Sequence, residues 1–275
     1  MEPTLVRSPA VAGRFYPHKR EALLRDVDHY LEYETDDEKT YESAIACVVP
    51  HAGYMYSGHV AGAVFRLLPA HSHYVIMGPN HSARGAPLAV MSRGSWLTPL
   101  GHVELDTELA GYIREKCAML AEDAEAHASE HSLEVQLPFL QRLSGTLTFV
   151  PIAIAIADYT TLLHLGWAVA DAVRRLKEPV MIVASSDMNH YEPDSVTREK
   201  DDNAIEKILQ LDPAGLMEVI REMDISMCGY APTIAVLAAA KKLGASRARL
   251  IRHATSADAT GDTDSVVGYA GIIVY

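Results

Sequence analysis

The chain has 275 residues and a formal net charge of −12, with 24 Lys and Arg against 36 Asp and Glu. This length is ample to bury a sizeable core, and we expect a single domain over residues 1–275. The negative charge argues against nucleic acid and anionic membrane surfaces, which are bound through clustered Lys and Arg. No apolar run approaches the roughly 20 residues of a membrane span, and we recognise no signal peptide.

Three cysteines are present, Cys47, Cys117 and Cys228. They are too few, and odd in number, for a disulfide framework. Together with the lack of an export signal, this predicts reduced thiols and a cytoplasmic location.

In chain order, apolar runs and helical spacing predict alternating elements, and the acidic stretch Glu32 to Glu42 is expected to be a surface loop. The expected elements are a strand at 45–50, a helix at 57–68, strands at 74–77 and 87–91, helices at 106–120 and 129–143 (kinked at Pro138), a strand at 147–156, a helix at 159–176, a strand at 180–184, helices at 195–211, 213–223 and 230–243, and strands at 248–254 and 266–274. Such alternation predicts an α/β fold, a single-domain sandwich with a central mixed, largely parallel sheet flanked by helices.

Side chains able to bind a ligand follow three of the predicted strands. His51 comes after the first strand, His81 after the second, and Asp187 with His190 after the strand at 180–184. Open α/β sheets bind ligands beyond the carboxyl ends of their strands, so these residues are expected to converge. The spacing of Asp187 and His190 suits a ligand with an acid–base partner. The alternative is that Asp187 caps the next segment and His190 lies at the surface.

Cys228 directly precedes the predicted helix at 230–243. A thiol at a helix N-terminus has a lowered pKa, because exposed amide groups stabilise the thiolate. Thiolate ligates metals or attacks electrophiles, so Cys228 is the candidate functional cysteine. Cys47 and Cys117 lie inside a predicted strand and helix, and we expect them to be packing residues.

The remaining histidines divide into a few groups. His131 and Glu134 form an HxxE pair, and Glu130 or His131 either lines the pocket or lies at the surface. His253 is expected to be structural. The others are expected at the surface: His18, His29, His71, His73, His102 and His164. The sequence contains no Walker loop, GxGxxG after a strand, HExxH or GxSxG, so nucleotide-binding, zincin and α/β-hydrolase functions lose their usual support.

Taken together, several ordered segments resemble the Memo family, whose microbial members are known as AmmeMemoRadiSam system protein B. The resemblance spans essentially the whole chain. It is carried by the segments 9–17 (PAVAGRFYP), 50–54 (PHAGY), 78–81 (GPNH), 130–134 (EHSLE), 185–191 (SSDMNHY), 228–230 (CGY), 254–258 (ATSAD) and 267–271 (VGYAG).

The resemblance implies the fold of class III extradiol ring-cleaving dioxygenases, in which two histidines and a glutamate hold ferrous iron. Carried over residue by residue, it implies that His51, His81 and Cys228 are the metal ligands, with Asp187 and His190 in the same pocket. The thiolate departs from the dioxygenase ligand set. Iron is the first expectation for the metal, with copper or zinc as alternatives. The aromatic residues expected to line the pocket are Phe15, Tyr16, Tyr54 and Tyr56.

Three functions remain open from the sequence. The first is an iron or copper redox protein with oxygen chemistry, in which His190 moves a proton and Asp187 either orients His190 or acts as a further metal ligand. The second is a binding module for a peptide, a small aromatic ligand or a partner protein. The family resemblance implies AMMECR-type and radical-SAM companions, and animal relatives are associated with phosphotyrosine signalling. The third is a zinc-dependent hydrolase with Asp187 as the base.

Overall fold

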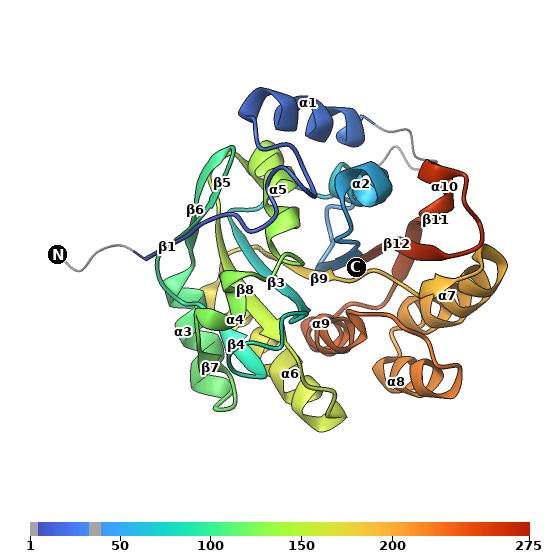
Figure 1. Cartoon of the computed structure of the whole chain (residues 1–275). Coiled ribbons are helices and arrows are strands. Elements are labelled where there is room, and N and C mark those ends of the chain that lie inside the picture. The colour runs from blue at the N-terminus through green and yellow to red at the C-terminus, as the bar shows by residue number, and fades with distance from the viewer. Residues whose placement is uncertain (1–4, 33–39) are drawn as a thin grey trace.

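A computed structural model describes residues 5–32 and 40–275 of the chain (Figure 1). The strands in this part are β1 (Val6–Arg7), β2 (Ala46–Val49), β3 (His73–Pro79), β4 (Leu88–Val90), β5 (Ser95–Thr98), β6 (Gly101–Leu105), β7 (Ala121–Glu122), β8 (Thr148–Ile154), β9 (Val180–Ser185), β10 (His190–Glu192), β11 (Ala248–Thr255) and β12 (Val266–Val274). The helices are α1 (Arg20–Leu31), α2 (Tyr54–Phe65), α3 (Thr107–Lys116), α4 (Glu125–Ala128), the 3₁₀ turn η1 (Glu134–Gln136), α5 (Leu137–Ser144), α6 (Tyr159–Leu176), α7 (Asp194–Leu209), α8 (Pro213–Glu222), α9 (Tyr230–Leu243) and α10 (Ala257–Thr260).

The strands form one mixed sheet with the path β1-β5-β6-β8-β3-β9-β2-β12-β10. Its centre, β6-β8-β3-β9-β2, is parallel, and β12 joins β2 in the antiparallel sense. The predicted α/β fold with a mixed, largely parallel sheet is therefore confirmed. Because β2, β9 and β3 are parallel neighbours, their carboxyl ends lie side by side at one edge of the sheet.

Both faces of the sheet are covered by helices (Figure 1). Helices α1, α2 and α5 pack on one face, and α3, α6 and α9 pack on the other, flanked by α7 and α8. Successive strand residues point to opposite faces, so Val75 and Met77 enter one core while Tyr74 and Ile76 enter the other. This double burial explains why the central strands are continuous apolar runs in the sequence.

Most of the predicted elements are present, and α6, α9 and β12 have the predicted bounds. The helix predicted at 129–143 is wrong over its first residues, where a loop precedes η1. In that loop the Glu130 carboxylate accepts hydrogen bonds from the backbone amides of His131 and Ser132, which fixes a non-helical turn. Pro138 does not kink a helix, because it lies in the first turn of α5, where its missing N–H costs nothing.

Helix α1 was absent from the sequence prediction because its apolar signal is weak, with only Leu23 and Val27 fully buried. It packs across α2 at a close crossing, where a Cβ added to Gly62 would meet the carbonyl oxygen of Tyr30 at 2.3 Å. The predicted loop from Glu32 to Glu42 falls largely on residues 33–39, which lie outside the described residues. Within 5–32 and 40–275, no helix is both long and apolar enough to cross a membrane.

The histidines expected at the surface divide in two. His18, His29, His102 and His164 are exposed. His71 and His73 are half-buried, contrary to the prediction, because each is hydrogen-bonded near the start of β3. His73 contacts Asp106 and Glu178 through its two ring nitrogens. His253, on β11, bonds the buried Asp201 carboxylate, in agreement with a structural role.

A buried ion pair fastens the N-terminal segment to the body of the protein. The guanidinium of Arg7 pairs with the Glu134 carboxylate, donates to the carbonyl oxygens of His127 and Glu130, and stacks over Trp96. Glu134 also accepts the amides of residues 10 and 11 and the Tyr16 hydroxyl. Glu134 therefore points away from the strand ends, although the sequence pairs it with His131.

Replacing Arg7 with alanine is expected to lower the free energy of unfolding by about 3–5 kcal/mol, because the Glu134 carboxylate is left charged and buried. The matched control is Arg84→Ala, whose ion pair with Glu125 is exposed, and which is expected to cost at most about 1 kcal/mol. Urea unfolding measures both. Equal losses in the two variants would show that the Arg7 pair does not hold the N-terminal segment.

Candidate metal centre

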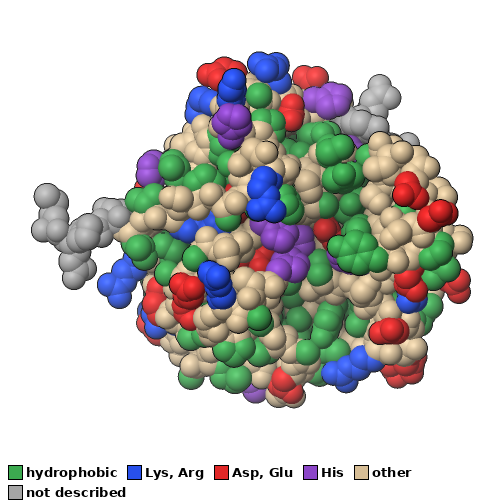
Figure 2. Space-filling view, in the orientation of Figure 1, with side chains coloured by type: hydrophobic (Ala, Val, Ile, Leu, Met, Phe, Trp, Pro, Cys, Tyr) green, Lys and Arg blue, Asp and Glu red, His purple; other side chains and the backbone are tan. Residues whose placement is uncertain are grey.

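Three adjacent parallel strands deliver the candidate ligands to one place. His51 follows β2, His81 follows β3, and Asp187 follows β9. Cys228 comes from a different part of the fold, the loop before α9, two residues before that helix begins. Figure 2 shows the histidine side chains gathered in a hollow at the centre of this face. The convergence predicted from strand placement is thus present in the fold.

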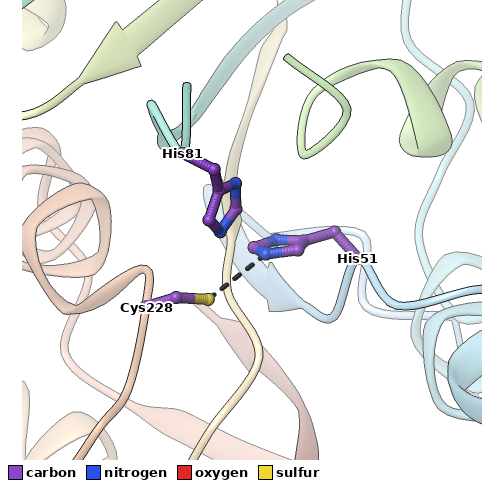
Figure 3. Close-up of side chains that lie close together, drawn as sticks. All are labelled: His51, His81 and Cys228. Atoms are coloured by element: carbon purple, nitrogen blue, oxygen red, sulfur yellow. Dashed lines mark hydrogen bonds between the residues drawn. The ribbon is translucent and has the colours of Figure 1, made fainter. Parts of the chain in front are cut away.

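The three predicted metal ligands point toward one another (Figure 3). Cys228 Sγ lies 3.2 Å from His51 Nε2, and one donor atom from each of His51, His81 and Cys228 lies within 4.8 Å of the others. Around a tetrahedral ion with bonds of about 2.0–2.3 Å, donor atoms lie about 3.3–3.8 Å apart. Small side-chain shifts therefore suffice for these residues to surround one ion. Imidazole with thiolate is a donor set for iron, copper or zinc.

Hydrogen bonds fix the tautomer of His51. Its Nδ1 lies 2.9 Å from Ser185 Oγ, which donates to the Ser132 carbonyl and accepts from the Gln136 amide. Because the Ser185 proton is used on the carbonyl, His51 Nδ1 must be the donor to Ser185. The Nε2 lone pair then faces Cys228 and is free to bind a metal.

Glu130 orients His81 in the same way. Its carboxylate accepts from the His81 amide at 2.6 Å and lies 3.0 Å from His81 Nδ1. Burial alone would raise the pKa of Glu130, but the His81 hydrogen bond and charge and the Ser132 amide outweigh it and lower the pKa to about 2. The carboxylate in turn raises the pKa of His81 against the opposing effect of burial. A carboxylate behind a ligating histidine is a recurrent arrangement in metal sites.

Two of the imidazoles stay neutral in the metal-free protein. Burial and the nearby His81 lower the pKa of His51 to about 3. Burial and the nearby His51 lower the pKa of His131 to about 4. A neutral imidazole has the free lone pair that a metal requires, so His51 needs no deprotonation before binding.

The prediction of a lowered pKa for Cys228 is wrong for the protein without a metal. Burial, followed by the negative charge of Asp187, raises its pKa well above the usual range. These effects outweigh the proximity of the α9 N-terminus. The thiol therefore needs a nearby cation to ionise, and a bound metal supplies one. Cys47 and Cys117 are buried, as expected of packing residues.

Asp187 and His190 both border the candidate ligands. Asp187 Oδ1 accepts the amides of His51 at 2.7 Å and Ala52 at 3.3 Å, and burial raises the pKa of this carboxyl. His190 lies half-buried at the start of β10, with its Nδ1 2.9 Å from the carbonyl oxygen of Ser226. Neither is within the group of three donor atoms, but both line the same cavity.

That cavity has a volume of about 870 Å³. Of the predicted pocket residues, Phe15 and His131 line it, with Tyr56, and Glu130 lies behind His81. Tyr16 and Tyr54 do not line it, which corrects the sequence prediction. Both rings are buried in the core beneath, where the Tyr54 hydroxyl donates to the Val135 carbonyl and the Tyr16 hydroxyl to Glu134.

His131, His81 and Glu130 form a second set of side chains close enough together to hold a metal ion. The His131 ring stacks on that of His81, with centroids 4.7 Å apart, and meets Phe15 edge-on. This group is a poor separate metal site, because the Glu130 oxygens already accept four hydrogen bonds. We assign His131 to the wall of the cavity beside His81.

Sequence reasoning did not single out several residues of the site. Ser185 and Gln136 orient His51, Ser226 contacts His190, and Tyr191 and Tyr269 line the cavity. Ser185 and Tyr191 lie in the segment SSDMNHY and Tyr269 lies in the segment VGYAG, so the resemblance contained a signal for these three residues. Tyr191 has a positive φ of 61° and is 77% exposed, a conformation that no single-residue pattern reveals.

The fold and these residues define an α/β protein with a candidate mononuclear metal centre at the ends of its parallel strands. A family model described as "Memo-like protein" matches residues 7–273, and the chain belongs to this Memo family. A MEMO1 family protein from Pyrobaculum arsenaticum is 45% identical, over 98% of this chain and 99% of the relative. One from Methanopyrus kandleri is 42% identical, over 97% and 98% of the two chains.

A solved structure of an uncharacterized protein from Escherichia coli K12 has the same fold. The TM-score is 0.60, with 16% sequence identity, and the match covers 84% of this chain and 99% of the other. At this identity, the likeness concerns the fold alone.

The Glu130→Gln variant tests the carboxylate behind His81 through the pH dependence of stability. The folded-state pKa is depressed from 4.5 to about 2. The stabilisation is therefore present above about pH 4.5 and is lost as pH falls toward 2. In metal-free protein, the wild type should lose stability over this range more steeply than Glu130→Gln, as measured by urea unfolding. Parallel pH profiles would contradict the ionised, hydrogen-bonded state of Glu130.

Proposed function

We propose that this Memo-family protein binds one redox-active metal ion, iron first and copper as the alternative, through His51, His81 and Cys228, and performs oxygen-dependent chemistry beside it. The observation that carries this proposal is the convergence of the three donor atoms within 4.8 Å. Two of the donors follow the ends of β2 and β3, which lie on either side of β9, and the third lies just before α9. Two imidazoles and a thiolate form a donor set for both metals and leave coordination positions open.

When bound, the metal would supply an electrophilic and redox-active centre for a substrate or oxygen. The chain's own residues would then handle protons. The carbonyl oxygen of Ser226 can only accept, so His190 Nδ1 must donate to it, and neutral His190 accepts a proton at Nε2. Asp187 is buried beside His51, where it provides a carboxylate acceptor at the cavity wall. His190 and Asp187 are the proposed acid–base pair.

The ligand would be an organic molecule rather than a diatomic gas alone. A volume of about 870 Å³ lies in the range of sites for drug-sized molecules. Phe15, Tyr56 and Tyr191 offer apolar ring surface. The lining also holds Arg14 and, besides Asp187, the carboxyl group of Asp262. Small aromatic compounds and short peptide segments both suit this lining.

The cavity also supports a second candidate function, in which the pocket binds a peptide or partner protein without turnover. AMMECR-type and radical-SAM proteins are the proposed companions in that case. A zinc-dependent hydrolase, with Asp187 as base, is the third candidate. The three differ in whether the metal is needed and which metal supports activity.

Elemental analysis of protein purified without oxygen tests the metal centre. About one iron or copper ion per chain is expected in the wild type, and loss of that stoichiometry in Cys228→Ser, because the hydroxyl is a much poorer ligand than thiolate. Cys117→Ala is the matched control, since Cys117 is buried at the end of α3, and it should retain the metal. Metal retained at wild-type level in Cys228→Ser would remove Cys228 from the site.

A second comparison separates catalysis from binding. His81→Ala should abolish any oxygen consumption with candidate aromatic substrates, because it removes one of three donors. A pull-down with the same variant, using AMMECR-type and radical-SAM proteins from the same source as bait partners, reads out binding alone. Unchanged partner binding in His81→Ala, with no oxygen consumption in the wild type, would favour the binding module. Activity restored only by zinc, on ester or amide substrates, would favour the hydrolase.

A further inference from the structure

Two loops at the site are joined by hydrogen bonds along their length. One loop, residues 186–189, connects β9 to His190 at the start of β10, and the other, residues 226–229, leads into α9. These elements are distant in the sequence, and the loops bring His190 and Asp187 beside Cys228. We call the contacts between them the loop clasp. Its members are Ser186, Asp187, Asn189, His190, Ser226, Cys228 and Gly229.

Asn189 is the buried half of the clasp. Its side-chain oxygen accepts from both the amide and the hydroxyl of Ser226, each at 3.0 Å. Its side-chain nitrogen donates to the Glu192 carboxylate at 2.6 Å, and its backbone N–H donates to the Asp201 carboxylate at 2.9 Å. Asn189 is fully buried, so these bonds replace all contact with water.

Ser226 is the exposed half, and it holds His190 through two groups. Its hydroxyl oxygen accepts from the His190 amide at 2.8 Å, and its carbonyl oxygen accepts from His190 Nδ1 at 2.9 Å. The clasp thereby selects the His190 tautomer that carries its proton on Nδ1. Ser226 borders the cavity itself, so this contact lies at the functional end of the fold.

The same two loops are also joined by contacts of Cys228 and Gly229. The Gly229 amide donates to Ser186 Oγ at 3.0 Å, and Cys228 Sγ lies 3.7 Å from the Asp187 carbonyl oxygen. A Cβ on Gly229 would meet Ser186 Cβ at 2.4 Å, so only glycine permits this approach. Cys228 is therefore fixed between the closure at Gly229 and the one at Ser226.

We propose that Asn189 and Ser226 are positioning residues, which hold Cys228 at the metal donors and fix His190 in its Nδ1-protonated tautomer. This inference rests on the proposed metal centre, because Asn189 and Ser226 are assigned to hold the proposed ligand Cys228 and the proposed proton carrier His190 in place. Metal and catalytic groups need positions held within about 0.5 Å, which side chains on unsupported loops do not reach. Loss of a supporting hydrogen bond typically weakens metal binding about 10–100-fold.

Ser226→Ala is the informative variant, because Ser226 is exposed and its replacement leaves no cavity in the core. It removes the hydroxyl that binds Asn189 and the His190 amide, while Cys228 and His190 remain. Ser226→Thr retains the hydroxyl and serves as the conservative rescue. Ser195→Ala, an exposed serine at the start of α7, is the matched control.

Co²⁺ titration of the metal-free protein gives the first readout, through affinity and the thiolate-to-cobalt charge-transfer band. Ser226→Ala should bind Co²⁺ about 10–100-fold more weakly and with a smaller thiolate band. Ser226→Thr and Ser195→Ala should stay near wild type. Wild-type affinity and spectrum in Ser226→Ala would overturn the assignment of Ser226.

The second readout is the tautomer of His190 in metal-free protein, from long-range ¹H–¹⁵N correlations of the imidazole. The wild type should show the proton on Nδ1, donated to the Ser226 carbonyl oxygen. Ser226→Ala keeps this carbonyl but loses the hydroxyl that ties residue 226 to Asn189 and to the His190 amide, so the carbonyl is held less firmly and the tautomers should mix. An Nε2-protonated wild type, or the same tautomer in both proteins, would overturn the clasp.

The two readouts separate this inference from the proposed function. If wild-type protein bound no Co²⁺, the metal centre would fail, while the His190 tautomer would still decide whether the clasp exists. If Co²⁺ bound with a thiolate band that Cys228→Ser abolished and Ser226→Ala left intact, the metal centre would stand and the clasp would fail. Asn189→Ala should reproduce both Ser226→Ala effects, with unfolding measured alongside because Asn189 is buried.

Discussion

The buried carboxylate of Glu130 is the interaction on which the site depends. It accepts the His81 amide and lies within hydrogen-bond distance of His81 Nδ1, and it also accepts the amides of His131 and Ser132. An ionised carboxylate away from water is costly unless it is fully hydrogen-bonded, and here the bonds outweigh burial. One charge thus fixes both the loop that forms the cavity wall and the ring that faces Cys228.

The surroundings of Cys228 determine whether its side chain is a neutral thiol or a thiolate. Around it lie His51, neutral because it is buried, and Asp187, whose carboxyl pKa is raised by burial. A thiolate in that position has no protein cation among its hydrogen-bond partners in the described chain, which are His51 and the Asp187 carbonyl. The low-dielectric site therefore favours either a neutral thiol or a thiolate bound to a metal, and a metal ion resolves the cost of burying the charge.

The fold and the convergence of the site were predictable from the sequence, because double-sided burial makes the central strands apolar and parallel strands end together. The positions of His51, His81 and Asp187 follow from that rule. The pKa of Cys228 was not predictable, since burial and Asp187 outweigh the helix end and both depend on tertiary packing. The same holds for Tyr16 and Tyr54, whose hydroxyl partners fix them in the core.

The segment from Glu130 to Glu134 links the stability of the fold to the site. The Glu130 side chain points toward His81, whereas the side chain of Glu134, four residues later, points toward the N-terminal segment and pairs with Arg7. Arg7 also donates to the Glu130 carbonyl oxygen, at 2.6 Å. A ligand that binds only the folded state stabilises that state by mass action. A metal ion bound beside His81 would therefore stabilise the loop around Glu130, which is also the loop that Arg7 contacts. The N-terminal segment is thus part of the support of the candidate metal centre, because the Arg7–Glu134 ion pair and the candidate site share one backbone loop.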